Sequence, residues 1–118
     1  HTRLQGDWSS DVCSSDLESF PQYKLAKAQM KEACGLFTFV IKADDVLQIE
    51  KFCNSLQHIL MAVSWGGHES LIIPRCAGIK QNDFDASNKE HRMIRMYCGL
   101  EEPEYLIADL KQAFDALG

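Results

Sequence analysis

The stretch that decides the fold is MIRMYCGLEEPEYLIADLKQAFDAL, residues 93–117. Its first part, Met93 to Cys98, is rich in apolar residues and predicts a β-strand. Pro103 then opens a helix, because proline suits a first helical turn, and the acids around it face the positive end of the helix dipole. The apolar residues of this helix recur at helical spacing, at Leu106, Leu110, Phe114 and Leu117.

The chain before this stretch alternates between helical and strand patterns. Helices are predicted from Pro21 to about Ala33, ended by Gly35 as a left-handed cap, and from an N-cap at Asp44 or Asp45 to Gln57. Strands are predicted over residues 36–41, 59–63 and 71–73, and residues 75–90 read as a polar loop. Residues 36–41 are apolar on both faces, which indicates a strand covered on both sides or lying in an interface. The predicted fold class is an α/β (α+β) sandwich, a small sheet with helices packed on it.

The composition changes abruptly near residue 18. Residues 1–17 are rich in serine and aspartate and lack helical or strand periodicity, which predicts a flexible tail. Residues 7–17, DWSSDVCSSDL, resemble the conceptual translation of a sequencing-adaptor oligonucleotide, although a natural linker is the alternative. We therefore expect a non-native or disordered leader over residues 1–17 and one small domain over residues 18–118, a fragment that lacks its true beginning.

Composition excludes several partners. The 118 residues carry 12 basic and 17 acidic side chains, a net charge of −5, and the basic ones are scattered, which argues against nucleic acid. No apolar run approaches the roughly 20 residues of a membrane helix, and no secretory signal is visible. The odd number of widely spaced cysteines fits a reduced, cytoplasmic protein; we expect idle or buried thiols at Cys13, Cys34, Cys53, Cys76 and Cys98.

Arg95 is the first anomaly, because it lies inside an apolar strand pattern. A guanidinium cannot lose its proton, so in such surroundings it needs an anionic partner. One interpretation is a structural carboxylate, such as Glu69 or an acid of the last helix. The other is the carboxylate of a small molecule, which the planar guanidinium can bind through two parallel hydrogen bonds.

The turn SWGGHES, residues 64–70, is the second anomaly. Its two glycines allow a tight reversal, and a turn with a packed tryptophan is the simplest interpretation. Ser64, Ser70 and His68 lack the pattern of a nucleophile and its base. Because His58, His68 and His91 also lack the spacing of metal ligands, we assign no catalytic residue and no metal site.

Three separated segments together resemble the Cys/Met-metabolism family of pyridoxal-phosphate enzymes. They are AVSWGGHESLI at residues 62–72, IRMYCGLEEPEYLIADL at residues 94–110, and Pro21-Gln22-Tyr23 with Gln29-Met30 and Gly35. The family includes cystathionine γ-synthase, cystathionine β- and γ-lyases, methionine γ-lyase and homoserine sulfhydrylases. The resemblance implies the carboxy-terminal small domain of an aspartate-aminotransferase-like pyridoxal-phosphate enzyme.

The resemblance assigns substrate-binding roles to three residues. Arg95 matches the arginine that binds the α-carboxylate of the amino-acid substrate, and Ser64 matches a residue at the edge of that pocket. Trp65, within Ser-Trp-Gly-Gly, is reminiscent of bacterial cystathionine β-lyases and favours a carbon–sulfur β-lyase of trans-sulfuration and methionine biosynthesis. The alternatives are a cystathionine γ-synthase or homoserine sulfhydrylase, a non-catalytic amino-acid-binding module, and a purely structural domain.

The resemblance also implies what lies outside this chain. Pyridoxal 5'-phosphate would be bound mainly by a large domain upstream, so no cofactor-binding residue is assigned and this chain alone is expected to be inactive. A homotetramer is implied for the parent. After Pro74 the sequence departs from the family, with Arg75-Cys76-Ala77-Gly78-Ile79 in place of a His-Pro-Ala-Ser-Met-Thr-His type of segment, so the role of this loop in substrate choice is open.

Overall fold

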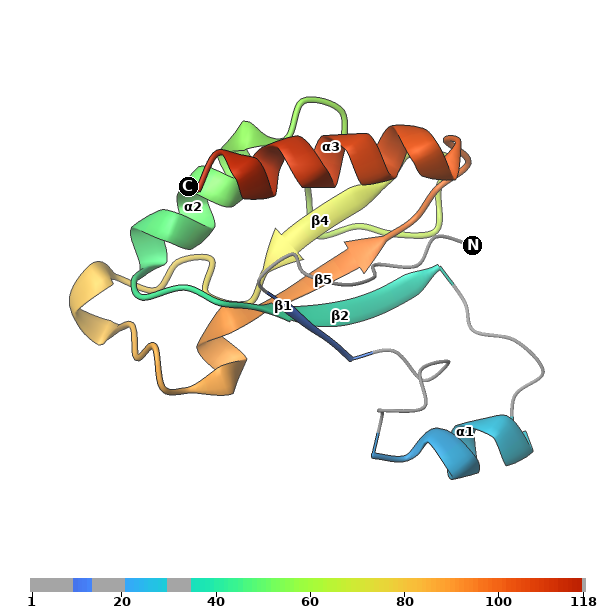
Figure 1. Cartoon of the computed structure of the whole chain (residues 1–118), viewed down its shortest axis with the longest axis horizontal. Helices are drawn as coiled ribbons and strands as arrows, with labels where there is room; N and C mark the ends of the chain where they lie inside the picture. The colour runs from blue at the N-terminus through green and yellow to red at the C-terminus, as the bar shows by residue number, and fades with distance from the viewer. Residues whose placement is uncertain (1–9, 14–20, 30–34, 118) are drawn as a thin grey trace.

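A five-stranded mixed sheet with two helices packed on it forms the core of the computed structural model, which describes residues 10–13, 21–29 and 35–117 (Figure 1). This confirms the predicted fold class. The strand order is β1-β2-β5-β4-β3. The strands are β1 (Ser10–Cys13), β2 (Leu36–Ile41), β3 (Leu60–Met61), β4 (Leu71–Pro74) and β5 (Met93–Tyr97). The helices are α1 (Tyr23–Gln29), α2 (Val46–Ser55) and α3 (Pro103–Asp115), with short 3-10 helices η1 (Gln81–Asp83) and η2 (Lys89–Arg92).

Strand β5 is the centre of the sheet. It pairs antiparallel with β2 on one edge and with β4 on the other, while β3 runs parallel to β4. Because side chains alternate along a strand, Ile94 and Met96 enter the core and are fully buried, whereas Arg95 faces the other side. In the register of the sheet Arg95 lies between Thr38 of β2 and Ile73 of β4.

The core lies between the sheet and the two helices, α2 and α3, which occupy the same side of the sheet in Figure 1. Three aromatic rings meet there, Phe39 from β2, Phe52 from α2 and Phe114 from α3. The ring centroids of Phe52 and Phe114 are 4.4 Å apart, and the Phe39 centroid lies 6.4 Å from each of them. Such offset and edge contacts add to the free energy gained by burying the rings. The apolar faces predicted for both helices are confirmed by the buried residues Ile49, Phe52, Cys53, Leu106, Leu110 and Phe114.

Asp109 of α3 fixes the segment between α2 and β3. Its carboxylate, 3% exposed, accepts hydrogen bonds from the main-chain N–H groups of Gln57 at 2.8 Å and of His58 and Ile59 at 2.9 Å. Desolvation opposes ionisation, but these hydrogen bonds outweigh it, so the pKa of Asp109 lies below its ordinary value. Asp109 therefore holds the start of β3 against the last helix.

Four details differ from the sequence prediction. Gly35 is not left-handed, because only Gly66 and Gly78 have positive φ among the described glycines; a Cβ at Gly35 would instead lie 2.9 Å from the Cys98 carbonyl oxygen. The strand expected over residues 59–63 is reduced to β3. The helix expected over residues 21–33 is described only as α1, and residues 30–33 lie outside the described ranges.

The fourth difference is β1, which lies within the predicted leader and pairs antiparallel with β2. Sheet edges pair through main-chain groups, so a segment without apolar alternation can still join one. The boundary between residues 17 and 18 stays a prediction. In the ranges that the structure describes, no helix has the length and apolar content to cross a bilayer.

Replacing Asp109 by asparagine is expected to lower the free energy of unfolding by about 2 kcal/mol, because an amide offers one acceptor oxygen in place of two. The effect depends on pH. Folding lowers the pKa of Asp109 from 3.8, so its full contribution is present above about pH 4 and is lost as the pH falls through the folded-state pKa.

Urea unfolding of the wild type and the Asp109→Asn variant, at neutral pH and along an acid series, measures both effects. Asp115→Asn, an exposed aspartate of the same helix, is the matched control and should leave stability unchanged. Equal stabilities of wild type and Asp109→Asn at neutral pH would contradict the role given to this carboxylate.

Candidate functional site

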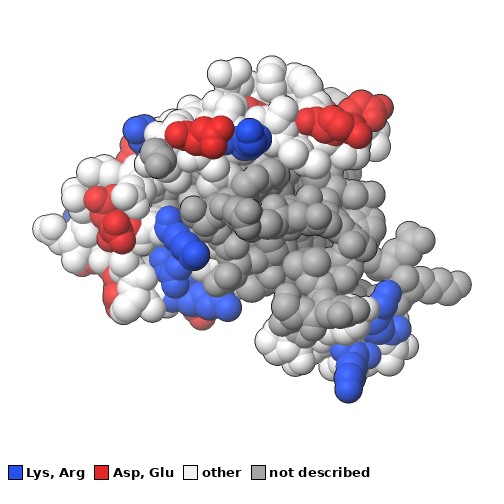
Figure 2. Space-filling model, in the orientation of Figure 1, with Lys and Arg blue, Asp and Glu red and all other residues white. Residues whose placement is uncertain are grey.

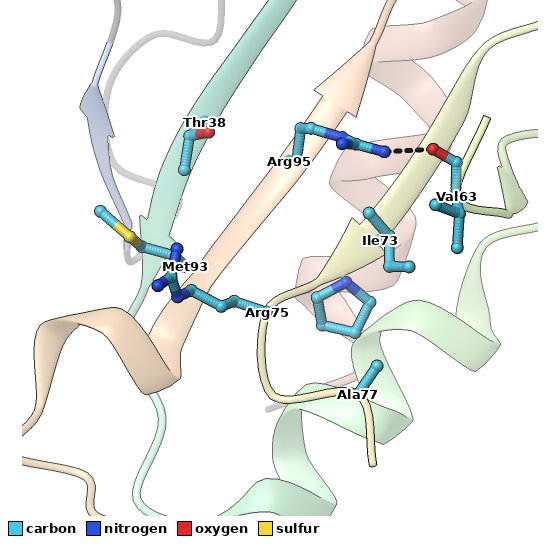
Figure 3. Close-up of a pocket in the computed structure, with 8 residues that line it drawn as sticks. Thr38, Val63, Ile73, Arg75, Ala77, Met93 and Arg95 are labelled. Atoms are coloured by element: carbon cyan, nitrogen blue, oxygen red, sulfur yellow. Dashed lines mark hydrogen bonds between the residues drawn. The ribbon is translucent and has the colours of Figure 1, made fainter. Parts of the chain in front are cut away.

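Arg95 projects from the side of β5 opposite the core and is half-buried. Its Nη2 donates a hydrogen bond to the main-chain carbonyl of Val63 (Figure 3). Within the described part of the chain neither Glu69 nor an acid of α3 forms an ion pair with it, so the structural carboxylate considered from the sequence is not found there. The guanidinium has five N–H donors, and the carbonyl contact leaves others available to a ligand.

A pocket of about 530 Å³ surrounds this guanidinium. Apolar side chains and three polar ones line it: Thr38, Val63, Ile73, Pro74, Arg75, Ala77, Met93 and Arg95. No carboxylate is among these described lining residues, and two of them are arginines. A mainly apolar pocket lined by two cationic residues suits a small organic anion.

Ser64 and Trp65 follow Val63 but do not line this pocket. Both are exposed, and Trp65 keeps 58% of its surface accessible, so the packed tryptophan expected from the sequence is wrong. The tight reversal itself is confirmed, because Gly66 has φ of +95°. Arg95 thus contacts Val63, the residue before Ser64, whereas the side chains of Ser64 and Trp65 lie on the surface.

The 63–70 loop, residues Val63 to Ser70, is held by the end of β5 and the turn after it. The Tyr97 hydroxyl donates to the Gly67 carbonyl at 2.9 Å, and the Leu100 N–H donates to the His68 carbonyl at 2.8 Å. Together with the Arg95–Val63 contact, these bonds secure the loop along its length. The sequence offered no signal for them, because about 30 residues separate the partners.

Ser70 is a buried anchor of this loop, which the sequence suggested only as an unlikely nucleophile. Its hydroxyl donates to Glu101 Oε2 at 2.6 Å and accepts from the Gly99 N–H at 2.8 Å, while its own N–H donates to Glu101 Oε1 at 2.9 Å. Desolvation opposes ionisation of Glu101, but the bonds from Ser70 prevail and its pKa lies below the ordinary value. With its hydroxyl engaged in this way, Ser70 has a structural role.

In the part of the chain that the structure describes, the other titratable groups form no second candidate site. His58 Nδ1 lies 2.6 Å from the Tyr105 hydroxyl, and His91 Nδ1 accepts from the Asp85 N–H at 3.0 Å. Among the described residues, no group of three or more His, Cys, Asp or Glu side chains is placed to hold a metal ion. Burial raises the pKa of Cys53 to about 12, so this thiol is inert as a nucleophile at neutral pH.

Comparison with known proteins relates the chain to one enzyme family. The profile described as Cys/Met metabolism PLP-dependent enzyme matches residues 5–115, a range that starts inside the predicted leader. L-methionine gamma-lyase from Treponema denticola is 39% identical over 107 residues, which cover 86% of this chain and 26% of the relative. Cystathionine gamma-lyase from Homo sapiens is 36% identical over 113 residues, 92% of this chain and 28% of the relative.

A solved structure agrees with these sequence matches. The crystal structure of metB from Corynebacterium glutamicum superimposes with a TM-score of 0.75 and 29% identity, over 96% of this chain and 29% of that chain. The chain spans about a quarter of the length of the curated relatives it matches.

Gly99 permits the close approach on which the 63–70 loop depends. A Cβ at this position would lie 2.3 Å from the His68 carbonyl oxygen and 2.7 Å from the Glu69 carbonyl carbon. We expect Gly99→Ala to lower the free energy of unfolding by about 2 kcal/mol, since main-chain atoms have to shift. Gly67→Ala, where nothing lies within 4 Å of the added Cβ, is the control. Urea midpoints measure both variants, and equal midpoints would contradict the assignment.

Proposed function

The chain belongs to the Cys/Met metabolism family of pyridoxal-phosphate-dependent enzymes, and we propose that it supplies the substrate α-carboxylate site of a carbon–sulfur lyase acting on sulfur amino acids. The relatives named above are lyases of sulfur amino acids, which supports this class of reaction. The observation that carries the proposal is the half-buried guanidinium of Arg95, which has no carboxylate partner among the described residues and faces a pocket.

Arg95 can hold an α-carboxylate through two parallel hydrogen bonds. Fixing this group orients the bonds at Cα of the amino acid, which is a positioning contribution to catalysis. The proposal includes Ser64 and Trp65 as neighbours of the bound carboxylate, because they follow Val63, whose carbonyl contacts Arg95. Neither is assigned a proton-transfer step.

The family cofactor stabilises negative charge that develops at Cα when it is bound. Its aldehyde requires a lysine amine, and none of the described residues that line the pocket is a lysine. The pocket therefore fits a substrate carboxylate and does not fit the cofactor. We propose that a large upstream domain holds the cofactor, that this chain alone is inactive, and that the parent is a homotetramer, as the family resemblance implies.

The proposed reaction type is β-elimination, supported by the similarity of Ser64-Trp65-Gly66-Gly67 to cystathionine β-lyases. A second candidate is γ-elimination, favoured by the similarity to methionine gamma-lyase and cystathionine gamma-lyase. The test is to join this chain to its upstream coding sequence, load the enzyme with pyridoxal phosphate and supply L-cystathionine. Pyruvate would indicate β-elimination and 2-oxobutyrate γ-elimination. Amino-acid binding without either product would contradict the lyase and favour a γ-replacement enzyme or a binding module.

Arg95→Ala in that full-length enzyme is expected to lower kcat/KM about a hundredfold or more, because two charge-assisted hydrogen bonds are lost. Cofactor binding, followed by its visible absorbance, should persist. Arg95→Lys keeps the charge but not the planar geometry and should recover only part of the loss. Steady-state kinetics on sulfur amino acids measure the effect; kinetics equal to those of the wild type would rule out the role of Arg95.

A further inference from the structure

The pocket around Arg95 is also lined by a second arginine, Arg75, to which the family resemblance assigns no role. Arg75 follows the last residue of β4, and its main-chain N–H donates to the Met93 carbonyl at 2.9 Å. In Figure 3 the two arginine side chains extend in opposite directions, Arg95 toward Val63 and Arg75 toward Met93. A ligand lying across the pocket would therefore meet one cation at each end.

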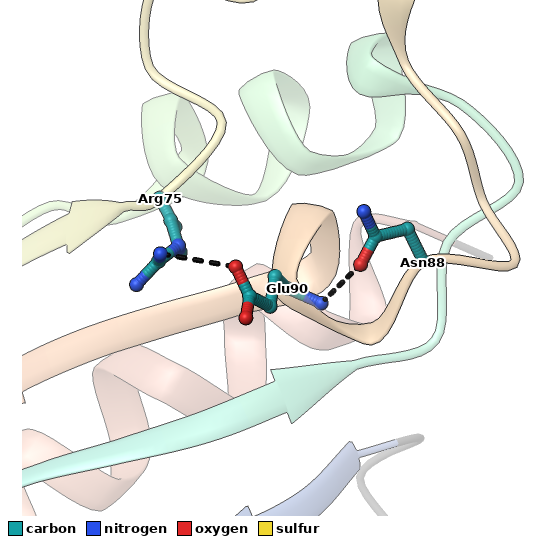
Figure 4. Close-up of polar contacts among 3 residues, drawn as sticks. All are labelled: Arg75, Asn88 and Glu90. Atoms are coloured by element: carbon teal, nitrogen blue, oxygen red, sulfur yellow. Dashed lines mark hydrogen bonds and ion pairs between the residues drawn. The ribbon is translucent and has the colours of Figure 1, made fainter.

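Arg75 is available to a ligand because its ion-pair partner, Glu90, is an exposed side chain. Its Nη2 lies 3.0 Å from Glu90 Oε2, and the two side chains are 62% and 61% exposed. Such surface ion pairs contribute little to stability, so exchange for a ligand anion has little cost. Asn88 accepts a hydrogen bond from the Glu90 N–H at 3.0 Å (Figure 4), which keeps Glu90 at the start of η2 beside the pocket.

The charge distribution favours anions at this pocket. The chain has a net charge of −5, yet the described lining residues include two cations and no acid. Figure 2 shows a group of Lys and Arg side chains near the beginning of β5, with acidic side chains at its edge and further ones along α3. Ile73, Pro74 and Ala77 line the same pocket and offer apolar contact to a methylene or thioether chain.

We propose that Arg75 is a second anion-binding residue and selects substrates whose side chain ends in an acidic group. This inference rests on the proposed function, because it takes Arg95 as the site of the α-carboxylate. A substrate with acids at both ends would contact both guanidinium groups and place its apolar middle against Ile73 and Pro74. The loop after Pro74, where the sequence departs from its family, thereby becomes a determinant of substrate choice.

The test uses the pyridoxal-phosphate-loaded full-length enzyme and two substrates that differ only at the far end. S-(2-carboxyethyl)-L-cysteine and S-propyl-L-cysteine serve for β-elimination, and the corresponding homocysteine derivatives for γ-elimination. The quantity compared is the ratio of kcat/KM for the acidic substrate to that for the neutral one. Arg75→Gln should lower this ratio roughly tenfold to a hundredfold, the usual effect of losing a hydrogen bond to a charged group. Arg75→Lys should recover part of it.

Two controls separate the inference from the proposed function. Lys80→Gln, an exposed cation of the same loop outside the pocket lining, should leave the ratio unchanged, whereas Arg95→Gln should lower kcat/KM for both substrates. A ratio that Arg75→Gln does not alter, in an enzyme that processes both substrates, would overturn the role of Arg75 and leave the proposed function standing. Failure of the loaded wild type to process any of the four substrates would overturn both.

Discussion

The alternation of side chains along β5 is the constraint on which the rest of the structure depends. This strand has a partner on each edge, so it cannot rotate or slip by one residue without moving Ile94 and Met96 out of the core. The same register puts Arg95 on the opposite side, between Thr38 and Ile73. The packing free energy of the core therefore fixes the position of the cation, and a charge that is costly to bury in the core lies on the other side of the sheet, in the pocket.

The residues that follow β5 also fix the position of the 63–70 loop. Gly99 brings the backbone against His68, and Glu101 engages both polar groups of Ser70. These contacts connect the beginning of α3 to the loop whose first residue, Val63, accepts a hydrogen bond from Arg95. The pocket thus depends on a hydrogen-bonded frame as well as on the core. A change at this frame would alter the shape of the pocket without replacing a residue that lines it.

Features of the fold that follow a local sequence pattern could be predicted from the sequence. The faces of α2 and α3 follow a helical period, and Arg95 stands out within β5 because its neighbours are apolar. The sequence was insufficient for long-range polar contacts: Asp109 binds residues about 50 positions earlier, and Glu101 binds Ser70 31 positions earlier. Nothing local to those carboxylates marks their partners. The exposure of Trp65 could not be predicted from the sequence either, because it depends on which segments pack over the turn and not on the residues of the turn.

The edge of the sheet formed by β3 affects experiments on the isolated chain. Strand β3 is the outermost strand on that side, only two residues long, and both Leu60 and Met61 are about half exposed. The outer edge of such a strand presents main-chain donors and acceptors that a second molecule can join, and apolar side chains make the junction more stable. Strand addition here would produce oligomers joined through the edge of the sheet, so size measurements on the isolated chain should include a variant with a lysine at Leu60 or Met61.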